Sequence, residues 1–221
     1  MHSYERYILY RLALADQKRF SELRPKGAET NLFVYHIHKL IREGLVRKVD
    51  KGYALTASGT RYVDKLSLRN FEPRFQPKIV TLIICKNPKR EYLLYTRKQQ
   101  PFYGLIGFPY GKIHFGEKIK QAAERELREK TGLQANLIHS GDAYLTVSQN
   151  GELLTHMLAH VFVGTNPRGE AVTDSETGQA RWGKIAHADA IKFIPGFLEI
   201  LKATTKSAKP FFLELSIGGS A

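Results

Sequence analysis

The stretch GKIHFGEKIKQAAERELREKTGL, residues 111–133, combines a glycine-bracketed loop with a charged helix. Ile119, Ala123 and Leu127 recur at helical spacing, so one face of this helix can pack against a sheet. Gly132 stands where the helix is expected to end, because glycine adopts the left-handed backbone of a C-cap without strain. The stretch therefore predicts a loop, an amphipathic helix and a sharp stop.

Two carboxylates of this helix are spaced to bind one cation. Glu126 and Glu129 are three residues apart, so they lie on one face, one turn from each other. Mg²⁺ takes oxygen ligands and is usually held by one or two carboxylates together with substrate phosphates. Gly111 and Gly116 suit a loop whose backbone turns sharply or approaches a ligand closely. The pattern favours a site for Mg²⁺ and a phosphate-containing ligand.

The fixed positions of the stretch follow a known spacing. Gly111 is followed after five residues by Glu117, after seven more by Arg125-Glu126-Leu127, and then by Glu129 and Gly132-Leu133. This resembles the Nudix box, G-x5-E-x7-R-E-U-x-E-E-x-G-U, where U is a bulky aliphatic residue. The resemblance implies a hydrolase of nucleoside diphosphates linked to another group, with Mg²⁺ or Mn²⁺ as cofactor.

The same resemblance implies roles for individual residues. Arg125 would orient a carboxylate, and Glu117 would support the metal. A further carboxylate outside the box often assists in this family, and the candidates are Glu152, Asp174 and Glu176. The implied catalytic residues are Arg125, Glu126 and Glu129, the implied metal ligands are Glu117, Glu126, Glu129 and Glu176, and the implied substrate contacts are Gly111, His114 and Lys130.

Lys130 departs from the family pattern, which has a metal-binding glutamate there. A protonated lysine cannot ligate Mg²⁺, and it brings a positive charge near Glu126, four residues earlier on the same face. Three alternatives stay open. The domain hydrolyses slowly with Glu126, Glu129 and a carboxylate from elsewhere; or the ammonium replaces the metal and a diphosphate is bound without chemistry; or the side chain is solvated and clear of the site.

The residues around the box predict a sheet covered by helices. Apolar, β-branched runs predict strands, and Asn150-Gly151 is a strong hairpin turn signal. Asn166-Pro167 is expected to end the last of these strands. Tyr103, Phe108 and Tyr110 could stack on a base or belong to the core. The expected strands are residues 78–86, 91–97, 143–149 and 155–164, with a strand around Arg181-Trp182 and a helix at 187–203.

Residues 1–68 read as a separate helical unit. Apolar positions within 7–14 and 33–41 predict two helices, with a short helix at 20–23 between them. Thr30 or Asn31 is expected to cap the longer helix. Residues 47–56 alternate around Lys51-Gly52, which predicts a hairpin, and residues 55–66 predict a closing helix.

This order of elements resembles a winged helix-turn-helix, in which the third helix enters the DNA major groove and the wing contacts the backbone. Winged helices also serve as protein-interaction or dimerisation modules. The implied fold class is α+β, a winged helix-turn-helix followed by a Nudix α/β/α sandwich. The implied DNA contacts are Asn31, Tyr35, His36, Lys39 and Arg42 on the helix, with Arg47, Lys48 and Lys51 on the wing.

Charge and composition agree with two small domains. The chain carries 34 Lys and Arg against 21 Asp and Glu, a net charge of +13. A basic surface attracts nucleic acid through counterion release, and it attracts nucleotides or acidic lipids equally well. The expected organisation is a winged helix over 1–68, a linker over 69–77 and a Nudix domain over 78–221, with the tail 216–221 mobile.

The remaining features bound the class of protein. Cys85 is the only cysteine, which excludes an internal disulfide, and its apolar strand indicates a core residue. No transmembrane run or secretory signal is present, so a cytoplasmic protein without a membrane partner is expected. A homodimer is compatible with the winged helix.

Two functions from different classes follow. The first is a Mg²⁺-dependent Nudix hydrolase with a DNA-binding-like N-terminal domain. The second is a transcriptional regulator whose degenerate Nudix domain senses a nucleotide or sugar diphosphate without hydrolysing it. The nearly intact box favours the first, and Lys130 favours the second.

Overall fold

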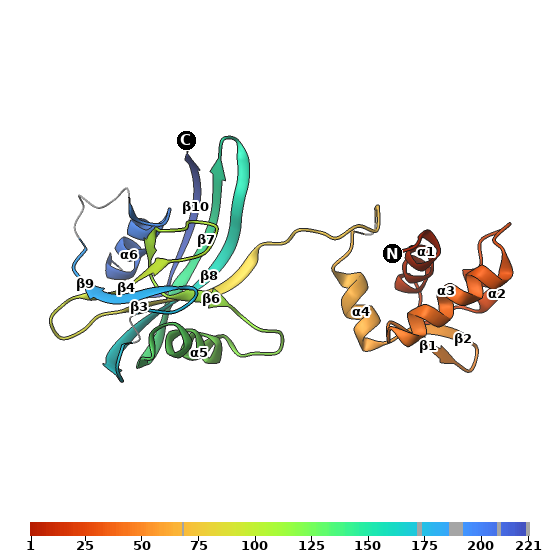
Figure 1. The fold of residues 1–221 in the computed structure, drawn as a ribbon, viewed down its shortest axis with the longest axis horizontal. Helices are drawn as coiled ribbons and strands as arrows, with labels where there is room; N and C mark the ends of the chain where they lie inside the picture. The colour runs from red at the N-terminus through yellow and green to blue at the C-terminus, as the bar shows by residue number, and fades with distance from the viewer. Residues whose placement is uncertain (68, 172–173, 186–191, 207–208, 220–221) are drawn as a thin grey trace. The chain divides into compact units, whose positions relative to one another are not determined.

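The computed structural model describes residues 1–67, 69–171, 174–185, 192–206 and 209–219. The chain forms two compact units, Met1–Phe75 and Gln76–Ala221. Both are drawn in Figure 1, and each is described here by itself. No helix among the described residues combines the length and the apolar composition that crossing a membrane requires.

The first unit has the expected order of helix, short helix, long helix, hairpin and helix. Buried apolar residues of all these helices form one core, which includes Ile8, Leu23, Phe33, Ile37 and Val63. The elements are α1 (Ser3–Ala13), α2 (Phe20–Leu23), α3 (Thr30–Arg42), β1 (Val46–Val49), β2 (Gly52–Leu55) and α4 (Ala57–Asp64). The N-terminal helices and the small hairpin are confirmed, while the identity of the unit as a winged helix stays a prediction.

Two local predictions in this unit were wrong. The N-cap of α3 is Glu29, whose carboxylate accepts hydrogen bonds from the backbone N–H groups of Asn31 and Leu32 at 2.8 and 2.6 Å. The expected linker also starts too early. Phe71 is buried in the core of the first unit, and the backbone N–H of Arg74 bonds to the carbonyl of Lys65 at 2.9 Å. Phe71 and Arg74 therefore belong to the first unit, which extends to Phe75.

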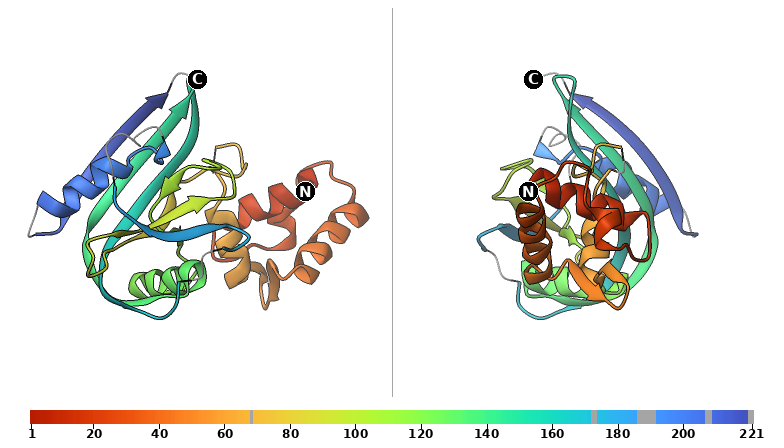
Figure 2. Two further views of the ribbon diagram at one scale, coloured as in Figure 1. Left: turned by 60° about the vertical axis from the view of Figure 1, so that its left-hand side comes forward. Right: turned by 90° about the vertical axis from the view of Figure 1, so that its right-hand side faces the viewer.

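The second unit is built on two sheets with a helix on each side (Figures 1 and 2). The larger sheet has the strand order β10-β7-β8-β3-β6, and the smaller one β5-β4-β9. The strands are β3 (Lys78–Cys85), β4 (Tyr92–Arg97), β5 (Ile106–Gly107), β6 (Tyr110–Lys112), β7 (Gln134–Gln149), β8 (Glu152–Arg168), β9 (Gly178–Gly183) and β10 (Phe211–Gly219). The helices are α5 (Ile119–Thr131) and α6 (Phe197–Lys206).

Two hydrophobic clusters separate these layers. Ala123 and Leu127 of α5 pack with residues such as Ile83 of β3, and Phe197 and Ile200 of α6 pack in the other cluster. In Figure 1, α5 lies below the strands and α6 lies on the opposite side. The helix α5, which carries Glu126 and Glu129, lies directly against β3 and β6 of the larger sheet.

Several boundaries differ from the sequence expectation for physical reasons. Asn166-Pro167 does not end β8, because a register shift against β7 accommodates these two residues, and a bulge tolerates the missing N–H of proline. The described part of the 187–203 helix begins only at Phe197, after a turn at Pro195-Gly196, while residues 187–191 lie outside the described residues. The tail was expected to be mobile from residue 216 onward, but the residues up to Gly219 belong to β10, which pairs with β7 in parallel.

The turn at Asn150-Gly151 is confirmed. Both residues have positive φ angles, 53° and 82°, and Gln149 pairs with Glu152 on either side of the turn. Two consecutive positive φ angles are the geometry that asparagine and glycine favour in a two-residue hairpin. Gly132 likewise has a φ of 72° and ends α5 as expected.

Candidate active site

Glu126 is held at the site by the close approach of α5 to β6. Its side chain is largely buried over Gly111, which pairs with Thr81 of β3. A Cβ atom at position 111 would lie 1.8 Å from Cδ of Glu126 and within 2.1 Å of both carboxylate oxygens. Only glycine at 111 leaves room for this carboxylate, which is the physical reason for the first glycine of the box.

Arg125 ties the acidic residues of the box together. Its Nε and Nη2 donate to the two carboxylate oxygens of Glu117 at 2.8 and 2.9 Å. Its Nη1 donates to Oε1 of Glu126 at 2.7 Å and to Oε2 of Glu129 at 3.2 Å. Nη2 also donates to the carbonyl of Lys112 at 3.0 Å, which links the helix to β6. Arg125 therefore orients three carboxylates at once.

Glu117 is bound on both oxygens. Besides the two bonds from Arg125, its Oε2 accepts the backbone N–H of His114 at 3.0 Å. The Arg125 guanidinium, followed by the His114 backbone bond, lowers the pKa of Glu117 from 4.5 to about 2. The side chain is thus a permanent anion that organises the loop and Arg125, and direct metal binding by Glu117 stays a prediction.

Lys130 points into the site. Its side chain is only 13% exposed, and its Nζ lies 3.8 Å from Oε2 of Glu126. The same Nζ lies 5.2 Å from the ring centre of Tyr95, within the range of a cation–π interaction. The alternative in which Lys130 is solvated and clear of the site is therefore wrong in this structure. The charge of Lys130 acts directly on the carboxylate that the box offers to a metal.

A polar cavity of about 330 Å³ opens beside Glu126. Four cationic side chains line it, together with His114, and Glu126 is the one carboxylate among the described residues of its lining. Arg97 is buried and donates from Nε to the carbonyl of Pro101 at 2.9 Å. The four cations are Lys78, Arg97, Lys112 and Lys130. This excess of positive charge suits an anionic ligand of the size of a diphosphate.

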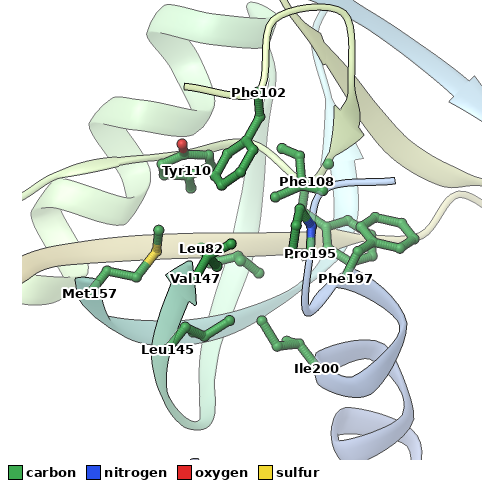
Figure 3. Close-up of a pocket in the computed structure, with 12 residues that line it drawn as sticks. Leu82, Phe102, Phe108, Tyr110, Leu145, Val147, Met157, Pro195, Phe197 and Ile200 are labelled. Carbon is green, nitrogen blue, oxygen red and sulfur yellow. The ribbon is translucent and has the colours of Figure 1, made fainter. Parts of the chain in front are cut away.

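An apolar cavity of about 40 Å³ lies next to the polar one, and Tyr110 and Met157 line both. Figure 3 shows its side chains converging from the strands, from the start of α6 and from the loop that carries Phe102. The ring of Phe108 is buried and stacks on Phe197 with 4.2 Å between ring centres. Phe108 is thus a core residue, whereas Tyr110 lies where a ligand in the polar cavity can reach its ring.

The sequence predicted the site residues within the box more accurately than it predicted the candidate metal ligands outside the box. Gly111, His114, Glu126 and Lys130 line the polar cavity, and Glu129 is exposed beside them through its bond to Arg125. The carboxylates considered outside the box, Glu152, Asp174 and Glu176, are all exposed and lie outside the described lining of this cavity. A metal-binding role for Glu176 stays a prediction.

Lys78, Arg97 and Lys112 were missed by sequence reasoning. Lys78 begins β3, Arg97 ends β4, and Lys112 ends β6, so three strand ends converge on one cavity. For Lys78 and Arg97 the only signal was a basic residue at one end of an expected strand, which is common on any surface, and Lys112 stood in the expected loop. Cys85 is buried as expected, and burial raises the pKa of its thiol to about 12, so it is no nucleophile.

The residues expected to face DNA divide into two groups. His36 is buried, with its Nδ1 2.8 Å from Oε1 of Glu5 and its ring stacked on that of His2, so its placement on the DNA-facing surface was wrong. Lys39 is half-exposed and bonds to the same Glu5 oxygen at 2.8 Å. The other predicted contacts are exposed: Asn31, Tyr35, Arg42, Arg47, Lys48 and Lys51. Their binding to DNA stays a prediction.

The donor set fits one divalent cation. Glu126 and the more exposed Glu129 offer carboxylate oxygens on one face of α5, and Mg²⁺ commonly takes one or two carboxylates plus phosphate oxygens and water. The neighbouring Lys130 lowers the affinity of this set for a cation through like-charge repulsion. Glu126 and Glu129 are thus the residues that would hold the metal.

Comparison with known proteins supports the geometry. The family model of the NUDIX domain matches residues 76–203, more than half of the chain. The crystal structure of a mutator MutT protein from Bacillus halodurans has a TM-score of 0.53 and 24% identity, over 63% of this chain and 89% of that one, which shows the shared fold. The chain belongs to the Nudix family.

Two curated relatives match the same region. An ADP-ribose pyrophosphatase of Methanocaldococcus jannaschii is 36% identical over 88 residues, which are 38% of this chain and 51% of that protein. An oxidized purine nucleoside triphosphate hydrolase of Danio rerio is 33% identical over 103 residues, 46% of this chain and 64% of that protein. The matched part thus spans about half to two thirds of these relatives.

Proposed function

We propose that the second unit is a Nudix hydrolase that cleaves a nucleoside diphosphate linked to another group, with Mg²⁺ or Mn²⁺ as cofactor. The observation that carries this proposal is the polar cavity, where four cationic side chains surround Glu126 on the box helix. A diphosphate supplies the negative charge that these cations neutralise. One relative is named an ADP-ribose pyrophosphatase and the other an oxidized purine nucleoside triphosphate hydrolase. Both names support a substrate that contains a nucleoside and a phosphate chain.

Different residues of the site bind phosphate and orient the carboxylates in the proposed hydrolysis. Lys78, Lys112 and Lys130 bind the phosphate oxygens, and Arg97 closes the wall of the cavity. Arg125 holds Glu126 and Glu129 in the orientation that cation binding needs. A bound Mg²⁺ would neutralise phosphate charge and lower the pKa of the attacking water. Water then adds to one phosphorus as the P–O bond to the leaving phosphate breaks, and the proton of the water passes to a nearby base.

Release of phosphate or nucleotide from a panel of nucleoside diphosphate derivatives tests this proposal. Turnover is expected with Mg²⁺ or Mn²⁺, and none is expected with EDTA. Glu126→Gln should abolish turnover. Glu124→Gln, a matched change at an exposed position of the same helix, should leave it unchanged. Equal turnover in Glu126→Gln and in the native chain would refute the assignment of the site.

A regulator is the second candidate, and the position of Lys130 favours it. An ammonium 3.8 Å from Glu126 can neutralise that carboxylate and bind phosphate in place of a metal, so that a diphosphate is sensed and not cleaved. The exposed basic side chains of α3 and of the β1–β2 hairpin support the further proposal that the first unit binds double-stranded DNA.

Fluorescence anisotropy with labelled duplex DNA separates the two candidates. A regulator shows sequence-dependent DNA binding that changes when a nucleoside diphosphate is added, and it shows no turnover. Arg47→Ala together with Lys48→Ala should weaken binding about equally on all sequences, because wing residues contact phosphates. No duplex binding at low salt would exclude DNA as a partner and leave the hydrolase.

A further inference from the structure

A second group of metal-ligating side chains lies away from the box, on β7 and β8. His139, Asp142 and His160 each offer one ligand atom, and these atoms all lie within 4.8 Å of one another. Nε2 of His139 is 3.0 Å and Nδ1 of His160 is 2.7 Å from the same oxygen, Oδ1 of Asp142. The side chains are 39%, 33% and 17% exposed in chain order, so solvent and small ions reach them.

A bulge in β7 brings these side chains together. In a regular strand, residues three apart point to opposite faces of the sheet, so His139 and Asp142 would diverge. The register against β8 shifts between His139 and Gly141, and Gly141 has a φ of 152°. A Cβ at 141 would lie 2.4 Å from the carbonyl oxygen of Phe211 in β10, so glycine is required where the neighbouring strand passes. The bulge turns His139 onto the face that carries Asp142 and His160.

The cluster is separate from the box site. Thr81 of β3 pairs with Gly111 of β6 and with His160 of β8, and His160 pairs with Asp142 of β7. Gly111 and Asp142 are thus three strand spacings apart in one row across the sheet, or about 14 Å at the usual spacing between strands. Side chains at the two places cannot share one ion.

We propose that His139, Asp142 and His160 form a binding site for one divalent transition-metal ion of the Zn²⁺ class. Two imidazoles and one carboxylate are ligands that Zn²⁺, Co²⁺ and Ni²⁺ accept, whereas Mg²⁺ prefers oxygen ligands alone. Ligand atoms of a tetrahedral zinc ion are about 3.4 Å apart. The three ligand atoms here all lie within 4.8 Å of one another, so small rotations of the side chains can place them around one ion. The fourth position is open to water or to a partner's side chain.

The electrostatics of the cluster agree with cation binding. Burial alone raises the pKa of Asp142, but hydrogen bonds with His139 and His160 outweigh it and hold this pKa below its usual range. Asp142 is therefore an anion placed between two imidazole rings, as a cation site requires. An ion here would join β7 to β8 beside β10, which lies next to β7 in Figure 1.

Cobalt absorbance tests the site directly. The full chain without a histidine tag, with the box saturated by excess Mg²⁺, is titrated with Co²⁺ and then with Zn²⁺ as a competitor. One Co²⁺ per chain should give the intense visible bands of a four-coordinate ion, which Zn²⁺ should abolish. His160→Gln and Asp142→Asn should each weaken binding at least about 10-fold, since each removes a ligand.

The matched control is His156→Gln, four residues along β8 on the same face, which should bind Co²⁺ like the native chain. Glu126→Gln should also keep the cobalt site, so that a failure of the hydrolase and a failure of this site are told apart. Melting temperature supplies a second measurement: Zn²⁺ should raise it for the native chain and not for Asp142→Asn. Cobalt spectra that are octahedral, or equal in the native chain and in His160→Gln, would overturn the proposal and leave a hydrogen-bonded cluster.

Discussion

Replacing Lys130 by methionine removes one positive charge from the box and keeps a side chain of similar length. Nζ of Lys130 lies 3.8 Å from Oε2 of Glu126, and the two side chains are 13% and 10% exposed. At an effective dielectric constant of about 20, this separation corresponds to an attraction of roughly 4 kcal/mol, which a cation must replace in order to use Glu126. Solvent near the cavity screens part of it, so roughly 1–2 kcal/mol is expected to appear in metal affinity.

Lys130→Met should therefore bind Mn²⁺ about 10-fold more tightly than the native chain, because about 1.4 kcal/mol corresponds to one factor of ten. Lys130→Glu, which restores the family residue, should gain more, about 100-fold, because it adds an oxygen ligand as well. Mn²⁺ affinity is measured by electron paramagnetic resonance, and turnover on the best substrate is measured in parallel. A large rise in turnover for Lys130→Glu would mean that the native domain has lost most of its catalysis.

The control is Lys120→Met on the same helix, where the lysine is exposed and outside the described lining of the cavity. Its Mn²⁺ affinity should equal that of the native chain, since a charge that is solvated and distant is screened. Lys130→Met and Lys130→Glu with no higher Mn²⁺ affinity and no faster turnover than Lys120→Met would refute the argument that Lys130 competes with the metal.

Other predictions concern the carboxylates and their supports. Gly111→Ala should displace the Glu126 carboxylate, which a Cβ would approach to 1.8 Å, and should reduce turnover by about 100-fold with an unchanged circular dichroism spectrum. Arg125→Gln should reduce turnover to a similar extent and weaken Mn²⁺ binding, and full activity in this variant would contradict the orienting role. For Glu5, burial raises the pKa, yet hydrogen bonds from Lys39 and His36 lower it from 4.5 to about 2. Since the folded state holds the lower pKa, this stabilisation, about 3 kcal/mol at most, is present above about pH 4.5 and is lost towards pH 2. Thermal melting from pH 2 to 6 should show this acid-dependent loss in the native chain and a smaller one in Glu5→Gln.

The local features of the box were readable from the sequence because they depend on neighbours in the chain. Helical spacing of Ala123 and Leu127 predicted the buried face of α5, and Gly132 marked its end, with a φ of 72° in the structure. Asn150-Gly151 predicted the β7–β8 turn through the same kind of short-range preference. Ile119 is exposed, so the first position of the helical repeat was misjudged, since a helix end can project past the sheet.

Features that depend on contacts between distant segments were not readable. The strand β10 was not predicted, and its last residues, 216–219, were taken for part of a mobile tail, because Phe211–Gly219 gains its structure from pairing with β7 about 70 residues earlier. His36 lies on α3 at a spacing that suited DNA contact, yet Glu5 of another helix holds it in the core. A buried partner on a separate element leaves no trace in local sequence.

The sequence by itself therefore determined the family, the α5 carboxylates and the order of elements in the first unit, since motif spacing and backbone preferences act over a few residues. Only the tertiary structure decided that Lys130 points at Glu126, that Lys78, Arg97 and Lys112 gather around it, and that a bulge brings His139 to Asp142. These facts depend on strand register and on side chains that meet across the sheet, and register is set by packing of the whole domain.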